Sequence, residues 1–193
     1  MARYYAFYKP YGVLTTFTDP QSRSTLKEYI QIQGIYAAGR LDMDSEGLLL
    51  LTDDGPLINC LTDPKYNHQK TYLVQVEGMI TCEAVEKLVT GVVIKGEKTR
   101  PCIVEIISPP ELPPRGRPIT PHAPTSWIKM ILSEGKNRQI RHMTAAVGFP
   151  TLRLVREAVG PIHLGDLHPG EVRELTSGEV RQLKKIKLRS SHA

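Results

Sequence analysis

The sequence predicts an α+β fold with a mostly antiparallel sheet. Segments with the two-residue alternation of strands occur along the whole chain, but they do not alternate regularly with helices as in βαβ units. Of 193 residues, 40% are hydrophobic and 23% charged, a mixture that fills a core and excludes a disordered chain. The length allows one large domain or two small ones, and we expect a single domain over residues 1–193.

The first half of the chain contains three predicted strands and a short helix. Residues 3–8 alternate as a strand and end at a turn, and the capping box Thr25-Leu26-Lys27-Glu28 opens the helix. Four consecutive leucines, Leu48 to Leu51, predict a strand buried on both faces. Residues 70–77 form the clearest alternating strand.

The second half adds strands, helices and one long loop. We expect helices at 81–90, ended by Gly91, and at 137–147, ended by Gly148 and Pro150. The expected strands are 92–94, 102–107, 127–132, 152–156 and 172–175. Residues 108–126 carry seven prolines in nineteen positions, which predicts a loop, and a second capping box at Thr176 opens a helix that ends in a basic tail, 184–193.

Several classes of protein are excluded by composition. The longest aliphatic run is the four leucines Leu48 to Leu51, far too short to span a membrane, and the first ten residues do not resemble a signal peptide. Cys60, Cys82 and Cys102 form no CxxC pair, and the histidines lack metal-like spacing. We therefore expect a cytoplasmic protein that needs no metal and no cofactor.

Charge is distributed unevenly along this basic chain, whose net charge is +5. Residues 42–63 include six acidic residues and neither Lys nor Arg, whereas residues 134–156 include five basic residues and one acidic. A basic surface around an acidic centre is typical of a protein that acts on a polyanion, although an ordinary solvated surface explains the same pattern.

The segment from Gly39 to Thr52 is the most informative. Arg40 and Asp42 are two positions apart just before the buried strand, so a loop there could hold an ionised aspartate beside a cation, ready to act as nucleophile or base. The acids at 42, 44 and 46 also match half of a calcium loop, but the second half is an apolar strand. A polar turn in which Arg40 pairs with a neighbouring acid is a third interpretation.

This segment resembles the catalytic motif of the RsuA/RluB-type pseudouridine synthases. Three more segments, 8–14, 70–74 and 135–143, resemble further motifs of that family in the family's order, and the resemblance covers residues 3–175. It implies two mixed, mainly antiparallel β subdomains with flanking helices around a central cleft. The opening motif begins at Arg3 without the S4 RNA-binding domain of many relatives, which resembles the large-subunit (23S) synthase E branch.

The resemblance also implies roles for individual residues. Asp42 would be the catalytic aspartate, Tyr72 would lie on the uracil, Arg141 would form the salt bridge that holds Asp42, and Arg40 would take the place of the target base or contact a phosphate. Further RNA contacts are expected at Lys9, Lys136, Arg138, Arg153 and Arg156. Taken without the resemblance, Tyr72 is ordinary strand packing and Arg138 and Arg141 share a solvated helix face.

We therefore expect a monomeric isomerase that converts one uridine to pseudouridine in a 23S rRNA stem-loop. Two routes remain open for the catalytic aspartate: attack on C1′ of the ribose, or abstraction of the 2′ proton. Three alternatives also remain: the same chemistry on 16S rRNA or tRNA, a non-catalytic RNA-binding or ribosome-assembly protein, and a nucleoside hydrolase.

Overall fold

The computed structural model describes residues 2–190 and confirms the α+β class. Its strands are β1 (Tyr4–Lys9), β2 (Tyr36–Ala37), β3 (Glu46–Thr52), β4 (Lys70–Glu77), β5 (Val93–Ile94), β6 (Glu97–Lys98), β7 (Ile103–Ile107), β8 (Thr125–Leu132), β9 (Thr151–Val159), β10 (Ile162–His163) and β11 (Val172–Glu174). Its α-helices are α1 (Gly55–Thr62), α2 (Cys82–Thr90), α3 (Gln139–Ala146) and α4 (Ser177–Ser190), and its 3-10 helices are η1 (Leu26–Glu28) and η2 (Pro64–Tyr66).

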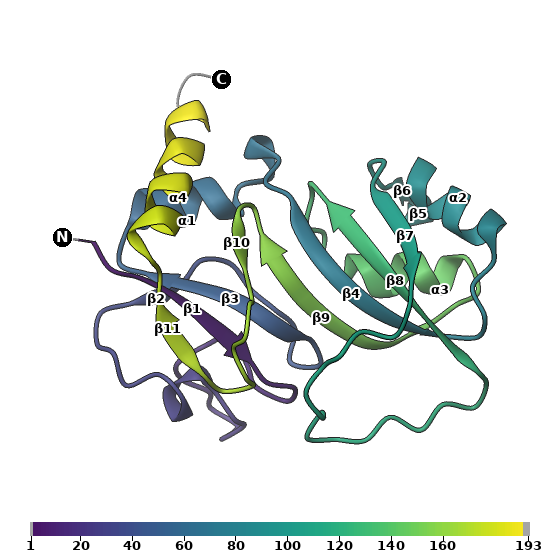
Figure 1. The fold of residues 1–193 in the computed structure, drawn as a ribbon, viewed down its shortest axis with the longest axis horizontal. Helices are drawn as coiled ribbons and strands as arrows, with labels where there is room; N and C mark the ends of the chain where they lie inside the picture. Colours follow the sequence, from purple (N-terminus) through teal and green to yellow (C-terminus); the bar gives the residue numbers. More distant parts are fainter. Residues whose placement is uncertain (1, 191–193) are drawn as a thin grey trace.

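Nine strands form one mixed sheet in the order β11-β1-β3-β9-β4-β8-β7, with β2 beside β3 and β10 beside β9 (Figure 1). All pairings are antiparallel except that of β3 with β9, which rests on two residue pairs, Glu46 with Val155 and Gly47 with Arg156. The two predicted subdomains are thus the two halves of one sheet. We call β11, β1, β3 and β2 the first half-sheet and β9, β4, β8 and β7 the second.

Gly47 allows the two half-sheets to meet. Its φ of +104° lies in the region that favours glycine, and a Cβ placed on it would lie 2.4 Å from the carbonyl oxygen of Arg156. Any larger residue would therefore push β3 and β9 apart at their short parallel junction.

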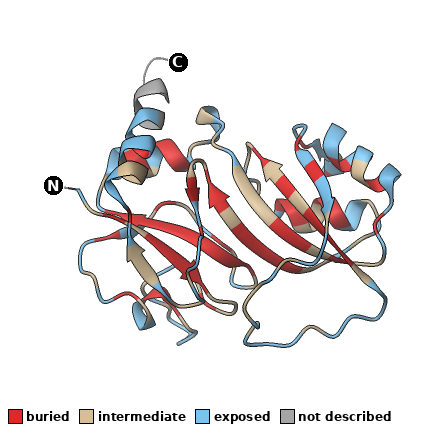
Figure 2. Cartoon of the chain, in the orientation of Figure 1, coloured by how far each residue is buried: buried red, intermediate tan, exposed pale blue. Residues whose placement is uncertain are grey.

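The core covers both faces of the sheet (Figure 2). All seven residues of β3 are buried, as the leucine run predicts. On one face, α1 and α4 cover the first half-sheet, and side chains of both half-sheets, such as Leu50 and Val155, share one cluster. Helices α2 and α3 cover the other face of the second half-sheet, where Leu88 and Met143 are fully buried.

Most predicted elements appear within two residues of their expected ends, and both capping boxes form. The helix expected after Thr25 is only the three-residue η1. Helix α1 has no counterpart among the predicted elements. It begins with Gly55-Pro56, and the Asp54 side chain accepts a hydrogen bond from the backbone N–H of Leu57 as its N-cap.

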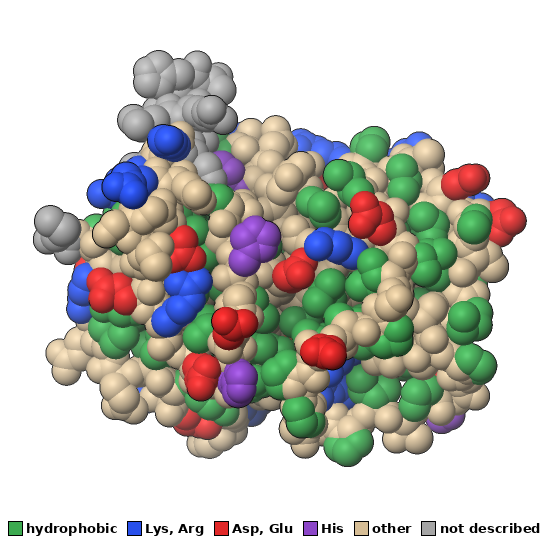
Figure 3. Space-filling model, viewed as in Figure 1, with side chains coloured by type: hydrophobic (Ala, Val, Ile, Leu, Met, Phe, Trp, Pro, Cys, Tyr) green, Lys and Arg blue, Asp and Glu red, His purple; other side chains and the backbone are tan. Residues whose placement is uncertain are grey.

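The proline-rich loop runs over residues 108–124, ending just before β8, and crosses from the second half-sheet toward the first (Figure 1). The predicted basic tail is mostly part of α4, and its residues 191–193 lie outside the described residues. On the face shown in Figure 3, Lys and Arg side chains are scattered among acidic and apolar ones. Within residues 2–190, no helix is long and apolar enough to cross a membrane.

Candidate active site

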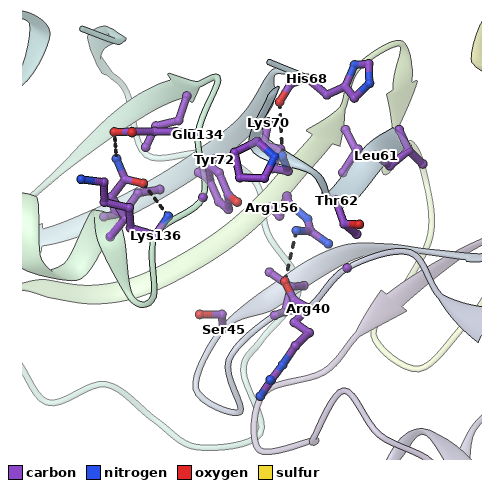
Figure 4. Close-up of a pocket in the computed structure, with 18 of the residues that line it drawn as sticks. Arg40, Ser45, Leu61, Thr62, His68, Lys70, Tyr72, Glu134, Lys136 and Arg156 are labelled. Atoms are coloured by element: carbon purple, nitrogen blue, oxygen red, sulfur yellow. Dashed lines mark hydrogen bonds between the residues drawn. The ribbon is translucent and has the colours of Figure 1, made fainter. Parts of the chain in front are cut away.

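A cleft of about 600 Å³ lies where the two half-sheets meet (Figure 4). One wall comes from the first half-sheet: residues 37–42, Ser45 and the end of α1. The other wall comes from β4, β9 and the segment 132–140 that leads into α3. Its volume lies within the usual range for pockets that hold small molecules or single groups of a larger ligand.

The loop that carries Asp42 is held by the N-terminal segment. Thr15 Oγ1 donates to the Leu41 carbonyl at 2.7 Å and accepts from the Leu41 N–H at 3.1 Å. The Gly12 N–H donates to the Met43 carbonyl at 2.7 Å, and the Ser45 N–H donates to the Asp42 carbonyl at 3.0 Å. These bonds tie the loop on both sides of Asp42, whose side chain lies in the cleft and remains 35% exposed.

The neighbouring carboxylate, Asp44, is occupied by two arginines. Arg138 donates to both of its oxygens at 2.8 Å, and Arg141 Nε lies 3.3 Å from Asp44 Oδ2. Arg141 Nη2 also donates to the Asp44 carbonyl at 2.7 Å. Burial alone would raise the pKa of Asp44, but the hydrogen bonds from Arg138 and the two guanidinium charges hold it below its usual value.

The prediction that Arg141 forms a salt bridge with Asp42 is therefore wrong, because Arg141 pairs with Asp44 instead. Among the described residues, Arg141 pairs with Asp44, and the cation nearest to Asp42 is Arg138, whose Nη1 lies 3.8 Å from Asp42 Oδ2. The physical reason is that both aspartates lie on one short turn, and the backbone of that turn directs the second of them at α3. Asp42 is left as the carboxylate with the weaker ion pair and the open position in the cleft.

Arg138 reaches Asp44 from a strained backbone conformation. It is the N-cap of α3, with φ +51° in the left-handed region that residues other than glycine adopt rarely. Its bidentate pairing with Asp44 ties α3 of the second half-sheet to the loop of the first. This ion pair thus connects the two walls of the cleft at its rim.

Tyr72 lies in the cleft as predicted. It is half-buried on β4, and its cross-strand neighbour on β9 is Arg156, so both side chains lie on the cleft face of the sheet. Arg40 is exposed at the opposite wall, and Figure 4 shows its side chain directed away from Arg156. Asp42, Tyr72 and Arg40 line one cleft, whereas Arg141 stands behind Asp44.

Two predicted RNA contacts are wrong, because their side chains are buried and already paired. Lys9 is fully buried and donates to the carbonyls of Pro10 and Val13 at 2.8 and 2.7 Å, and burial lowers its pKa to about 8. Arg153 forms a buried bidentate pair with Glu46, both bonds 2.9 Å, and also donates to the Pro113 carbonyl at 2.8 Å. Both side chains support the loops around the cleft from inside the protein.

The remaining predicted contacts lie at different depths in the cleft. Arg138 and Lys136 line its rim, where Lys136 also pairs with Glu97 at 2.6 Å. Arg156 is only 3% exposed and lies on the floor, donating to the Leu48 carbonyl at 2.7 Å. It is therefore not the surface phosphate contact that we expected.

Sequence reasoning missed two components of the site. Glu46 stands within the catalytic-motif segment, yet its pairing with Arg153 joins residues 107 positions apart and leaves no local signal. Lys70 precedes Tyr72 by two residues on the same strand, and this spacing alone would have placed it on the cleft face.

The arrangement does not form a calcium loop. Asp44 and Glu46, two of the three acids in the half-motif, each bind an arginine guanidinium with both oxygens. Within residues 2–190, no group of three or more His, Cys, Asp or Glu side chains could hold a metal ion. A carboxylate beside an aromatic ring and several cations can instead act as nucleophile or base on an anionic, ring-containing substrate.

Comparisons with known proteins agree with this geometry. Residues 3–146 match the family described as RNA pseudouridylate synthase. The chain is 50% identical over 171 residues to the ribosomal large subunit pseudouridine synthase E of Vibrio parahaemolyticus, covering 88% of this chain and 72% of that protein. It is 49% identical over 178 residues to the protein of the same name from Xanthomonas campestris, covering 90% and 95%.

A solved structure described as a pseudouridylate synthase has the same architecture. It aligns with a TM-score of 0.81 at 29% identity, over 95% of this chain and 74% of that one. The fold expected from the sequence motifs is thereby confirmed.

Proposed function

The chain belongs to the RNA pseudouridylate synthase family, and on this premise we propose that it isomerises one uridine of large-subunit ribosomal RNA, with Asp42 as the catalytic carboxylate. The observation that carries the residue assignment is the contrast between the two aspartates of one turn. Asp44 is held by two arginines, whereas Asp42 faces the cleft opposite Tyr72. The target class is supported by the names of relatives about half identical to this chain.

The reaction requires few protein groups besides a carboxylate. The N1–C1′ bond of the uridine breaks, the uracil turns, C5 joins C1′, the C5 proton is lost and N1 gains a proton. Composition is unchanged, which makes the enzyme an isomerase. Asp42 attacks C1′ or removes the 2′ proton, and Tyr72 supports the uracil ring during its rotation.

The groups around Asp42 keep it in place. Arg141 and Arg138 hold Asp44, so the turn that carries Asp42 cannot swing away from the cleft. Arg138 Nη1 lies 3.8 Å from Asp42 Oδ2 and makes its hydrogen bonds to Asp44, so the oxygens of Asp42 stay open to the substrate. Arg141 is thus a positioning residue that acts through Asp44.

The uridine must leave its helix to reach Asp42, as in other enzymes that act on a flipped base. Arg40, Arg138 and Lys136 lie at the rim, where phosphates of the flanking nucleotides would pass. We propose further that residues 1–193 act as one catalytic unit, as a monomer in the cytoplasm, on a stem-loop of the rRNA.

Purified protein and isolated ribosomal RNAs test the proposal. Wild-type protein should form pseudouridine in large-subunit RNA, measured by mass spectrometry of the digested RNA, and Asp42→Asn should form none while its Kd for the RNA stays within about threefold. Asp63→Asn is the matched control, because Asp63 also lines the cleft and Asn still caps η2.

Other outcomes identify the alternatives. Product in small-subunit RNA or tRNA alone would refute the target, free uracil would indicate hydrolysis, and RNA binding without product would indicate a non-catalytic protein. Full activity of Asp42→Asn would refute the assignment of the carboxylate.

A further inference from the structure

Two cations on the cleft floor lack an acidic partner. Arg156 uses Nε on the Leu48 carbonyl and Nη1 on the Arg40 carbonyl at 3.4 Å, while its buried Nη2 has no hydrogen-bond partner in the described part of the chain. The half-buried Lys70 donates to the His68 carbonyl at 3.3 Å. Among residues 2–190, neither side chain makes an ion pair, and Figure 4 shows both beside Tyr72.

Apart from Asp42, which has only the 3.8 Å pair with Arg138, the acids around this floor are already engaged. Asp63 pairs with Lys65, Glu46 pairs with Arg153, and Glu134 accepts from the Arg100 N–H. Burial lowers the pKa of Lys70, and the adjacent Arg156 charge lowers it further. Two neighbouring, partly desolvated positive charges without an anion cost folding free energy, so their presence indicates a ligand that supplies the missing negative charge.

We propose that Lys70 and Arg156 form an anion subsite beside Tyr72, in which Lys70 Nζ contacts an anionic oxygen of the substrate RNA. This inference rests on the proposed function. Lys70 contacts the substrate, whereas Arg156 contributes its charge from behind and holds the carbonyls at both ends of the catalytic loop. Lys70 and Tyr72 lie two residues apart on one strand face, about 7 Å, which is within the size of one nucleotide.

The substrate offers such an oxygen from two sources. One is a phosphodiester next to the target uridine. The other is the uracil itself: when the N1–C1′ bond breaks, its electron pair leaves with the base, and the negative charge spreads onto the uracil oxygens until C5 bonds to C1′. Lys70 stabilises the anion by charge and hydrogen bonding and transfers no proton in either case.

The test compares Lys70→Gln, Lys70→Arg and Lys129→Gln with wild type on the rRNA fragment that contains the target uridine. Lys129 is the matched control, since it lies on the adjacent strand β8 outside the cleft. Lys70→Gln should lower the single-turnover efficiency by about tenfold or more, Lys70→Arg should recover most of it, and Lys129→Gln should change it by less than about twofold.

Thermal unfolding separates this role from a structural one. Removing the Lys70 charge relieves its repulsion by Arg156, so Lys70→Gln should unfold at the wild-type temperature or above it. A lower unfolding temperature that accounts for the lost activity would overturn the proposal. So would a Lys70→Gln variant with wild-type Kd and wild-type rate.

Two arms identify the anion. If the phosphodiester is the anion, Lys70→Gln binds the RNA more weakly than wild type does. Wild type then loses the same affinity on RNA with a neutral methylphosphonate beside the target uridine, and Lys70→Gln loses no more on that RNA. An unchanged Kd with a slower single turnover assigns the departing uracil. If wild type forms no pseudouridine at all, the proposed function is refuted independently of the subsite. In that case, equal Kd values of wild type and Lys70→Gln for the RNA would also refute the subsite.

Discussion

Breaking the buried ion pair between Arg153 and Glu46 should destabilise the protein strongly. Their side chains are 9% and 2% exposed, and the guanidinium donates two 2.9 Å bonds to the carboxylate. Arg153→Met would leave Glu46 as an unpaired buried charge beside the β3–β9 junction, which costs about 3–5 kcal/mol. For a chain of this length, that loss corresponds to an unfolding temperature lower by roughly 10 °C.

Urea denaturation followed by circular dichroism measures this loss. The double variant Glu46→Leu/Arg153→Met should regain most of it, because an apolar pair of similar size removes the uncompensated charge. Lys129→Met is the control, since it breaks only the half-exposed pair with Glu157 and surface pairs contribute little. A loss of less than about 1 kcal/mol in Arg153→Met would show that this pair does not hold the junction.

Three further predictions concern the loop and the cleft. Asp44→Asn should slow product formation by about tenfold or more at unchanged product identity, because Arg138 and Arg141 lose their shared anchor, and a wild-type rate would refute its positioning role. Lys9 has a folded pKa of about 8 against an ordinary 10.5, so the folded state should gain stability from it as pH rises between these values. The free energy of unfolding of wild type minus that of Lys9→Met, from urea titrations, should therefore increase between pH 8 and pH 10.5. A difference that stays constant over this range would contradict the burial of Lys9. Tyr72→Phe should keep part of the activity and Tyr72→Leu should lose it, since the ring supports the base; equal full activity in both would remove Tyr72 from the site.

The elements of the fold follow largely from local patterns. Strand β4 has the ends expected from its alternation, and the four leucines of β3 are buried as a continuous apolar run requires. Helix α1 was harder to predict because it has eight residues and begins with Gly-Pro, although Asp54 before the proline is a recognisable N-cap. The union of both halves in one sheet depends on Gly47, whose close approach to β9 no local pattern contains.

The site was predictable in its position and less so in its contacts. The motifs correctly placed Asp42 and Tyr72 in one cleft. The spacing within the turn could not decide which aspartate α3 would bind. Lys9 and Arg153 looked like surface cations because charged residues are rarely buried. The partner acid of Arg153, Glu46, is 107 positions away, whereas Lys9 donates to carbonyls one and four residues away that no side-chain pattern marks.

The most direct test of the account is pseudouridine mapping of ribosomal RNA in cells that carry the wild-type gene or the Asp42→Asn variant. Carbodiimide-dependent stops of reverse transcription mark each pseudouridine. If Asp42 is the catalytic carboxylate, one stop in large-subunit RNA disappears in the variant and all others remain. An unchanged set of stops in both ribosomal RNAs would contradict it.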